Sequence, residues 1–155
     1  MKRSAGFSRC KHYRYWLKRE WDSELPTCAF ICLNPSTADA STDDPTLRRI
    51  THFATDWGYG SVWVVNLFAF RSTDPTGLMH IEDPVGARNN YWLRKITKEA
   101  ELAVAAWGNL GRYLERDKWM VRHRADLHCL GITKSSMPKH PLYCPQNAIP
   151  TLYRS

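Results

Sequence analysis

The sequence predicts an α/β protein, a three-layer sandwich around a four-stranded, mostly parallel sheet, with an N-terminal strand or hairpin ahead of it. Two observations support this prediction. Four short apolar runs recur along the chain, and each is nearly continuous rather than alternating, as is typical of strands buried on both faces of a sheet. Helical segments with one apolar face separate these runs, and helices of that kind join parallel strands by right-handed crossovers.

The four expected strands are residues 27–33, 61–70, 101–107 and 126–131. The first helix is expected to begin at Asp43-Asp44-Pro45, because an acidic residue before a proline favours a helix N-terminus, and to end at Gly58. Two further helices are expected over about 84–99 and about 110–122. Residues 13–21 alternate aromatic and basic side chains, which predicts an edge strand or hairpin with a solvated cationic face or a face that touches phosphates.

The length of 155 residues suits a single domain, with an N-terminal segment over 1–26, a core over 27–144 and a C-terminal tail over 145–155. Lys and Arg number 22 against 15 Asp and Glu, a net charge of +7, which makes DNA or a nucleotide the leading class of partner. No apolar stretch is long enough to span a membrane, and the N-terminus lacks the apolar segment of a signal peptide. We therefore expect a cytoplasmic protein without membrane contact.

The cysteine pattern indicates neither a disulfide framework nor a metal site. The five cysteines are an odd number, and three of them lie within apolar runs, where thiols behave as small core side chains. Cys28 and Cys32 share one face of an expected strand, but this spacing holds the sulfurs too far apart for one tetrahedral ion. We expect no metal and no cofactor.

Polar residues follow or end each expected strand, and ligands of open α/β sheets bind where the carboxyl ends of the strands meet. Asn66 is the most unusual of them, because an amide within an apolar run is costly to bury unless its donors and acceptors are matched. It either brackets a neighbouring loop or pairs with a ligand edge that offers a donor and an acceptor, as a nucleobase does. The other candidates at these positions are Asn34, Pro35, Ser36, Asp39, Arg71, Trp107, Lys134, Lys139 and His140.

The stretches FICLNPSTADASTDDPTLRRITHFATDWGYG, VVNLFAFRSTDP, VAAWG and LGITKSSMPKHPLY resemble the bacterial and phage domain-of-unknown-function family 1643. This resemblance covers nearly the whole chain after about Tyr13. The order of strand-Asn-Pro, strand-Asn, apolar strand ending in Gly, and strand leading to His-Pro is also similar, more distantly, to the uracil-DNA glycosylase superfamily.

The second resemblance implies a three-layer glycosylase fold and a role for three residues. Asn34 would position the hydrolytic water, Asn66 would read the base, and His140 would steady the departing base. The implied activity is that of a DNA glycosylase that recognises a modified or damaged base and hydrolyses its N-glycosidic bond. Ser36 stands where several of those branches have a glycine and Leu142 where they have a serine, so the substrate does not follow from the fold.

The chemistry of glycosidic cleavage suggests further roles. An asparagine places a water but cannot take its proton, so a base would be Asp39, Asp43 or Asp44, although Asp44 is also the expected helix cap. The platform for an extruded base would be Phe68, Tyr59 or Trp107, and the phosphates would meet Arg71, Lys134 and Lys139. Two alternatives remain open, namely a hydrolase or transferase that acts on a free nucleotide or nucleoside, and a non-catalytic module that binds a nucleobase.

Overall fold

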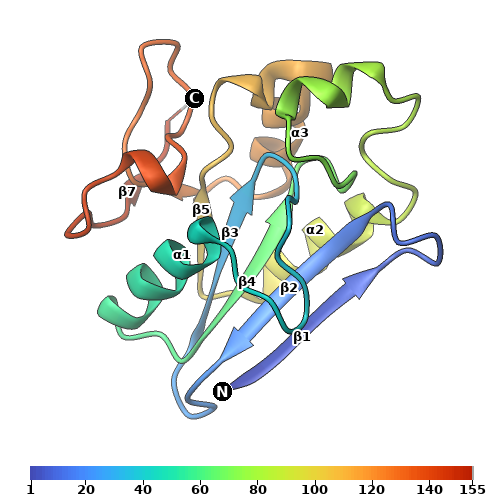
Figure 1. Ribbon diagram of the computed structural model, residues 1–155. Helices are drawn as coiled ribbons and strands as arrows, with labels where there is room; N and C mark the ends of the chain where they lie inside the picture. Colours follow the sequence, from blue (N-terminus) through green and yellow to red (C-terminus); the bar gives the residue numbers. More distant parts are fainter. Residues whose placement is uncertain (155) are drawn as a thin grey trace.

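The computed structural model describes residues 1–154, which form one mixed sheet with helices on both of its faces (Figure 1). The order of the strands across the sheet is β1-β2-β4-β3-β5-β6-β7. Their bounds are β1 Lys2–Phe7, β2 Arg14–Glu20, β3 Thr27–Cys32, β4 Ser61–Asn66, β5 Leu102–Ala105, β6 His128–Cys129 and β7 Thr151–Leu152. No helix within residues 1–154 has the length and apolar character to cross a membrane.

The pairing of the strands confirms the mixed α/β class and corrects the expected sheet. β3 pairs in parallel with both β4 and β5, and β5 pairs in parallel with β6, so the four strands expected from apolar runs are neighbours. The described residues also place β1 and β2 as an antiparallel hairpin beside β4, and β7 antiparallel to β6. The prediction of four strands is therefore wrong, because the hairpin joins the sheet and part of the expected tail forms its last strand.

The helices form the outer layers, with α1 (Pro45–Asp56) on one face of the sheet and α2 (Asn89–Glu99) and α3 (Arg116–His123) on the other (Figure 1). Alternate side chains of β3 supply both faces, since successive residues of a strand point in opposite directions. Phe30 is buried with the apolar side chains of α1, whereas Ile31 is buried with those of α2 and α3.

Helix α1 begins where the sequence predicts. The Asp44 Oδ1 atom accepts a hydrogen bond of 2.8 Å from the backbone N–H of Leu47, and Pro45 occupies the first turn. The other bounds differ from the prediction: β4 ends at Asn66, α2 begins only at Asn89, and the expected third helix is a 3₁₀ segment over Asn109–Glu115 followed by α3. The third helix is interrupted because Leu114 and Glu115 both have a φ of 54°, which no α-helix accommodates.

The five thiols are free and differ in exposure, which predicts a simple labelling pattern. Cys10 is exposed, and hydrogen bonding from Ser8 lowers its pKa, whereas burial raises the pKa of Cys28 and of Cys32 to about 12. Because the thiolate is the reactive form, we expect an alkylating reagent to modify Cys10 rapidly in the native protein and all cysteines only after unfolding. Mass spectrometry of timed reactions measures this, and rapid native labelling of Cys32 would contradict the burial of β3.

Candidate functional site

A cavity of about 460 Å³ lies at the carboxyl ends of β3, β4 and β5, within the range of roughly 300 to 1,000 Å³ that is usual for small-ligand sites. It brings together Asn34, Asn66 and His140, the three residues that the sequence predicts to share a crevice. The cavity is lined in addition by the charged side chains of Arg14 and Asp44. Predicted binding residues Pro35, Ser36 and Trp107 also line it.

Asn66 is the last residue of β4 and is only 1% exposed. Its Oδ1 atom accepts a hydrogen bond of 3.4 Å from Nη2 of Arg14, and its backbone oxygen accepts one of 2.8 Å from Nδ2 of Asn89. Its own Nδ2 has no hydrogen-bond partner among residues 1–154. The end of β4 is thus held in place, and the amide keeps a donor for a ligand.

Asn34 lies two residues after the end of β3 and bridges two loops. Its Nδ2 atom donates hydrogen bonds to the backbone oxygens of Ser72, at 2.9 Å, and of Pro35, at 3.1 Å. Both N–H groups of the amide are therefore used in bracketing the loops. Its Oδ1 atom makes no hydrogen bond within residues 1–154, which leaves an acceptor at the cavity that could orient a water.

Asp44 is the carboxylate of the cavity. One of its oxygens caps α1, and the position of the residue at the cavity wall leaves the second oxygen for other partners. The negative charge of Asp44 acts to raise the pKa of Arg14 and of His140, against the stronger effect of burial on both groups. A carboxylate therefore lies within electrostatic reach of both Arg14 and His140.

His140 precedes the short 3₁₀ turn Pro141–Tyr143 and caps it. Its Nδ1 atom accepts a hydrogen bond of 3.2 Å from the backbone N–H of Leu142, so in the neutral imidazole the proton is on Nε2. Burial lowers the pKa of His140 below its ordinary value of 6.5, and the charge of Asp44 opposes this shift. At neutral pH the side chain is an uncharged donor at the cavity wall.

The titration of His140 predicts how stability depends on pH. Because the folded pKa of His140 is lowered, the unfolded chain binds a proton first as the pH falls below about 6.5, and the free energy of unfolding falls with it. We expect His140→Gln, which cannot titrate, to make this fall less steep while the values above neutral pH change little in slope. Urea unfolding at a series of pH values measures the difference, and identical slopes for the two proteins would contradict a lowered pKa.

Arg14 is a charged cavity residue that sequence reasoning missed. It begins β2 and is 3% exposed, and its Nη1 atom donates a hydrogen bond of 2.9 Å to the backbone oxygen of Ala38. The alternating pattern of residues 13–21 placed the basic side chains on a solvated face, and the structure shows this to be wrong for Arg14 and for Arg19, which is 1% exposed. β2 lies between β1 and β4 rather than at the edge, and the loop after β3 covers the two side chains.

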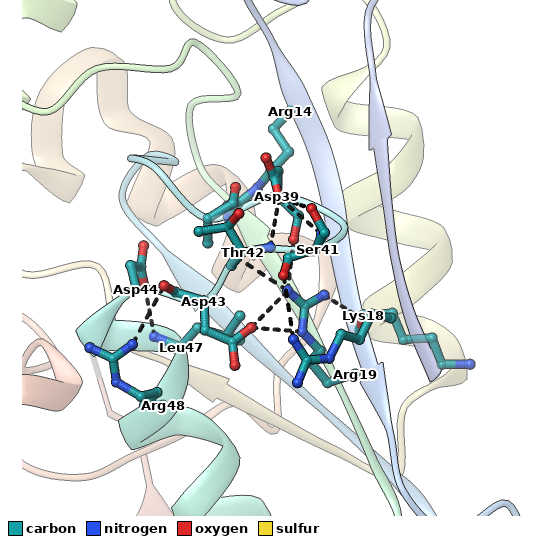
Figure 2. A network of polar contacts seen from close by, with 12 residues as sticks. Arg14, Lys18, Arg19, Asp39, Ser41, Thr42, Asp43, Asp44, Leu47 and Arg48 are labelled. Carbon is teal, nitrogen blue, oxygen red and sulfur yellow. Dashed lines mark hydrogen bonds and ion pairs between the residues drawn. The ribbon is translucent and has the colours of Figure 1, made fainter. Parts of the chain in front are cut away.

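Asp39 and Asp43 do not line the cavity. They belong to the polar network around Arg19 (Figure 2). The Oδ1 atom of Asp39 accepts hydrogen bonds from the backbone N–H groups of Ser41 and Thr42, and these bonds lower its pKa. Asp43 pairs with the buried Arg19, with 2.9 Å between Nη2 and Oδ1. Both carboxylates hold the loop that leads into α1, so Asp44 is the one of the three acidic candidates that lines the cavity.

Several other predicted residues lie away from the cavity lining. Phe68 is fully buried in the core, with its ring 5.6 Å from that of Tyr113. The Nη1 atom of Arg71 donates to the backbone oxygen of Lys11, and its guanidinium lies over the ring of Phe7. Tyr59, Lys134 and Lys139 are likewise not part of the lining. Cys32, by contrast, is a cavity residue that the sequence treated only as core.

The pair of Arg19 and Asp43 predicts a measurable contribution to stability. Asp43→Ala removes the carboxylate and leaves a buried guanidinium with carbonyl oxygens alone as acceptors, so we expect a loss of about 2 kcal/mol in the free energy of unfolding. Urea denaturation measures this loss. Glu99→Ala breaks the exposed pair with Lys95 and serves as the control, with an expected change below about 0.5 kcal/mol. Equal effects of the two changes would contradict the structural role of Asp43.

Fold and site together define a mixed α/β protein with a ligand-sized cavity at the carboxyl ends of its parallel strands, lined by apolar side chains and a few polar ones. The family described as "Protein of unknown function (DUF1643)" matches residues 14–142, and the chain belongs to this family. The match begins at Arg14 and ends at Leu142, so it contains every cavity residue discussed above. Comparison with curated proteins gives no match, and neither does comparison with solved structures.

Proposed function

We propose that the cavity binds a nucleobase and that the protein hydrolyses the N-glycosidic bond of a modified or damaged base in DNA. The observation that carries this proposal is the grouping of Asn66, Asp44 and His140 around one cavity, because these residues supply a base reader, a proton acceptor and an uncharged donor. The resemblance to the uracil-DNA glycosylase superfamily supports it. The motif positions that carry that resemblance follow three neighbouring parallel strands and the last loop in the same order.

Base recognition is assigned to Asn66 and to the cavity wall. The Nδ2 donor of Asn66 is available to a base oxygen or ring nitrogen, and its Oδ1 atom, now bonded to Arg14, is available to a base N–H. Trp107, two residues after the end of β5, supplies an aromatic surface of the cavity. A base in this position would be separated from its neighbours in the strand, so extrusion from the duplex precedes the reaction.

The reaction needs a placed water and a partner for the departing base. Oδ1 of Asn34 accepts a hydrogen bond from the water, and Asp44 takes its proton as the water oxygen bonds to C1′ of the sugar. The C1′–N bond breaks, and its electron pair leaves with the base. The Nε2–H of His140 donates a hydrogen bond to the negative charge that grows on the base, and His140 keeps this proton. The departed base is protonated through solvent, and Asp44 returns the proton of the attacking water to solvent and becomes a carboxylate again. The products are the free base and an abasic sugar.

A free nucleotide or nucleoside is the second candidate substrate. Arg71, Lys134 and Lys139, the residues expected to meet DNA phosphates, do not line the cavity, whereas the buried Arg14 does. A cation inside the cavity suits a small ligand that enters whole. If DNA is the substrate, the net charge of +7 predicts that the protein binds it less tightly as the salt concentration rises, and that this fall is steep.

An excision assay tests the proposal. The protein is incubated with duplex and single-stranded oligonucleotides that carry uracil, hypoxanthine or 5-substituted pyrimidines, and strand scission in alkali reports abasic sites. We expect scission with at least one modified base and loss of scission in His140→Ala, with Asp56→Asn, an exposed carboxylate at the far end of α1, as the active control. Base release from monomers alone would select the second candidate, and binding without release would select a non-catalytic module.

A further inference from the structure

Arg14 is a buried cation that has no carboxylate partner among residues 1–154, and it lies beside Asn66, the residue that we assign to base recognition. We propose that Arg14 binds an oxyanion of the ligand, either a carboxylate carried by the base or a phosphate of a nucleotide. This inference rests on the proposed function, which makes the ligand a nucleobase or a nucleotide. It adds that this ligand carries a negatively charged group. The side chain of Arg14 would then determine specificity within the cavity.

None of the hydrogen bonds of Arg14 within residues 1–154 has a charged acceptor. Nη1 donates to the backbone oxygen of Ala38 at 2.9 Å, and Nη2 donates to Oδ1 of Asn66 at 3.4 Å, which is near the limit for such a bond. Nε is buried and has no partner among residues 1–154. Both acceptors are uncharged, and a buried guanidinium without a carboxylate is costly to the folded protein. A ligand oxyanion would provide the missing acceptor and could engage the guanidinium in a forked pair.

Arg19, in the same strand, is a buried arginine whose charge is paired with a carboxylate. It is 1% exposed, and it donates from Nε and Nη2 to one carboxylate oxygen of Asp43 (Figure 2). Arg14 and Arg19 both belong to β2 and both donate to the loop after β3, but only Arg19 has an acidic partner in the described residues. Arg14 is also the one of these two arginines that lines the cavity. The contrast indicates that the partner of Arg14 comes from the cavity side.

The neighbouring acidic groups, Asp44 and Cys32, do not supply the charged acceptor that Arg14 lacks. Asp44 lies within electrostatic reach of Arg14, but it caps α1 and makes no ion pair with Arg14 among residues 1–154. Burial raises the pKa of the Cys32 thiol to about 12, so Cys32 is uncharged at neutral pH. Burial also lowers the pKa of Arg14 to about 10, which still leaves the guanidinium charged. A positive group therefore remains at the cavity wall for a ligand.

Matched ligands measure the preference for charge directly. Isothermal titration of the full protein compares orotate with its uncharged amide, orotamide, and uridine 5′-monophosphate with uridine. We expect the charged member of at least one pair to bind about tenfold or more tightly than its neutral counterpart. A preference within the first pair places the oxyanion on the base, whereas a preference within the second pair alone places it on the nucleotide phosphate.

Three variants connect any preference to Arg14. Arg14→Gln should abolish the preference, and Asn66→Asp should also abolish it, because a carboxylate next to Nη2 would occupy the guanidinium while Arg14 remains. Arg116→Gln is the control, since Arg116 is a buried arginine outside the cavity lining and its removal should leave the preference unchanged. If Arg14→Gln fails to fold, the Asn66→Asp protein still decides the question.

The outcomes separate this inference from the proposed function. Equal binding of charged and neutral members by the native protein overturns the role of Arg14, and so does a preference that persists in both Arg14→Gln and Asn66→Asp. If orotamide and uridine bind without any charge preference, nucleobase binding stands and the oxyanion site falls. If benzoate binds as tightly as orotate and depends on Arg14, the oxyanion site stands and nucleobase recognition falls.

Discussion

Asp44→Asn should lower the rate of glycosidic cleavage by about 10²- to 10⁴-fold while the fold remains intact. The amide cannot take a proton from the water, but asparagine caps helices about as well as aspartate does, so α1 keeps its first turn. The substitution thus removes the proton acceptor and keeps the helix cap. Single-turnover excision on the best oligonucleotide of the screen measures the rate, and circular dichroism confirms the helix content.

Two comparisons make the result specific to Asp44. Asp44→Ala should show the same loss of rate and, in addition, about 1 kcal/mol less stability, because it removes the cap. Asp56→Asn changes an exposed carboxylate of the same helix and should keep the native rate. An Asp44→Asn protein with undiminished cleavage would remove the general base from the mechanism and favour water activation by placement alone.

Phe30→Ala should destabilise the protein by about 3 to 5 kcal/mol, a large part of the stability of a domain of this size. Phe30 lies in the middle of β3 with no exposed surface, and its ring stacks on Trp57 at 5.8 Å in the layer between the sheet and α1. Truncation leaves a cavity under the helix that the Asp44 cap begins. Urea denaturation monitored by tryptophan fluorescence measures the loss.

The matched control for this truncation is Tyr91→Ala. Tyr91 is an aromatic residue of α2 that is 48% exposed and contacts Trp92 and Arg88 at the surface, so its removal should cost less than about 1 kcal/mol. Comparable losses for the two variants would mean that the layer between β3 and α1 is not tightly packed.

The parts of the fold that the sequence predicts are those governed by local rules. β3, β4 and β5 are evident because short, continuous apolar runs are typical of strands covered on both faces of a sheet. α1 is evident because Asp44-Pro45 is a strong start signal. β7 could not be predicted, since it has two exposed residues and exists only through its pairing with β6. The position of β2 inside the sheet likewise depends on a long-range pairing with β4 that no local pattern encodes.

In the candidate site, too, features set by local patterns could be predicted, and those set by long-range contacts could not. Asn34, Asn66 and His140 could be placed together because strands with parallel order bring their carboxyl ends to one edge. The choice among the acidic residues at 39, 43 and 44 could not be made, because the path of that loop is set by Arg19, which reaches it from another strand. Arg14 was missed for a related reason, as a basic residue in a basic strand gives no local signal of burial.

The cavity walls come from the beginning, the middle and the end of the chain, since Arg14, Asn66 and His140 all contribute. During synthesis Arg14 emerges from the ribosome early and His140 late. A nascent chain that ends before the last loop therefore contains only part of the cavity. Closing such distant contacts is the slow step in folding mixed sheets. A ligand that contacts all of these walls would therefore link the segment around Arg14 to the segment around His140. Its binding should slow global unfolding rather than the movement of one loop.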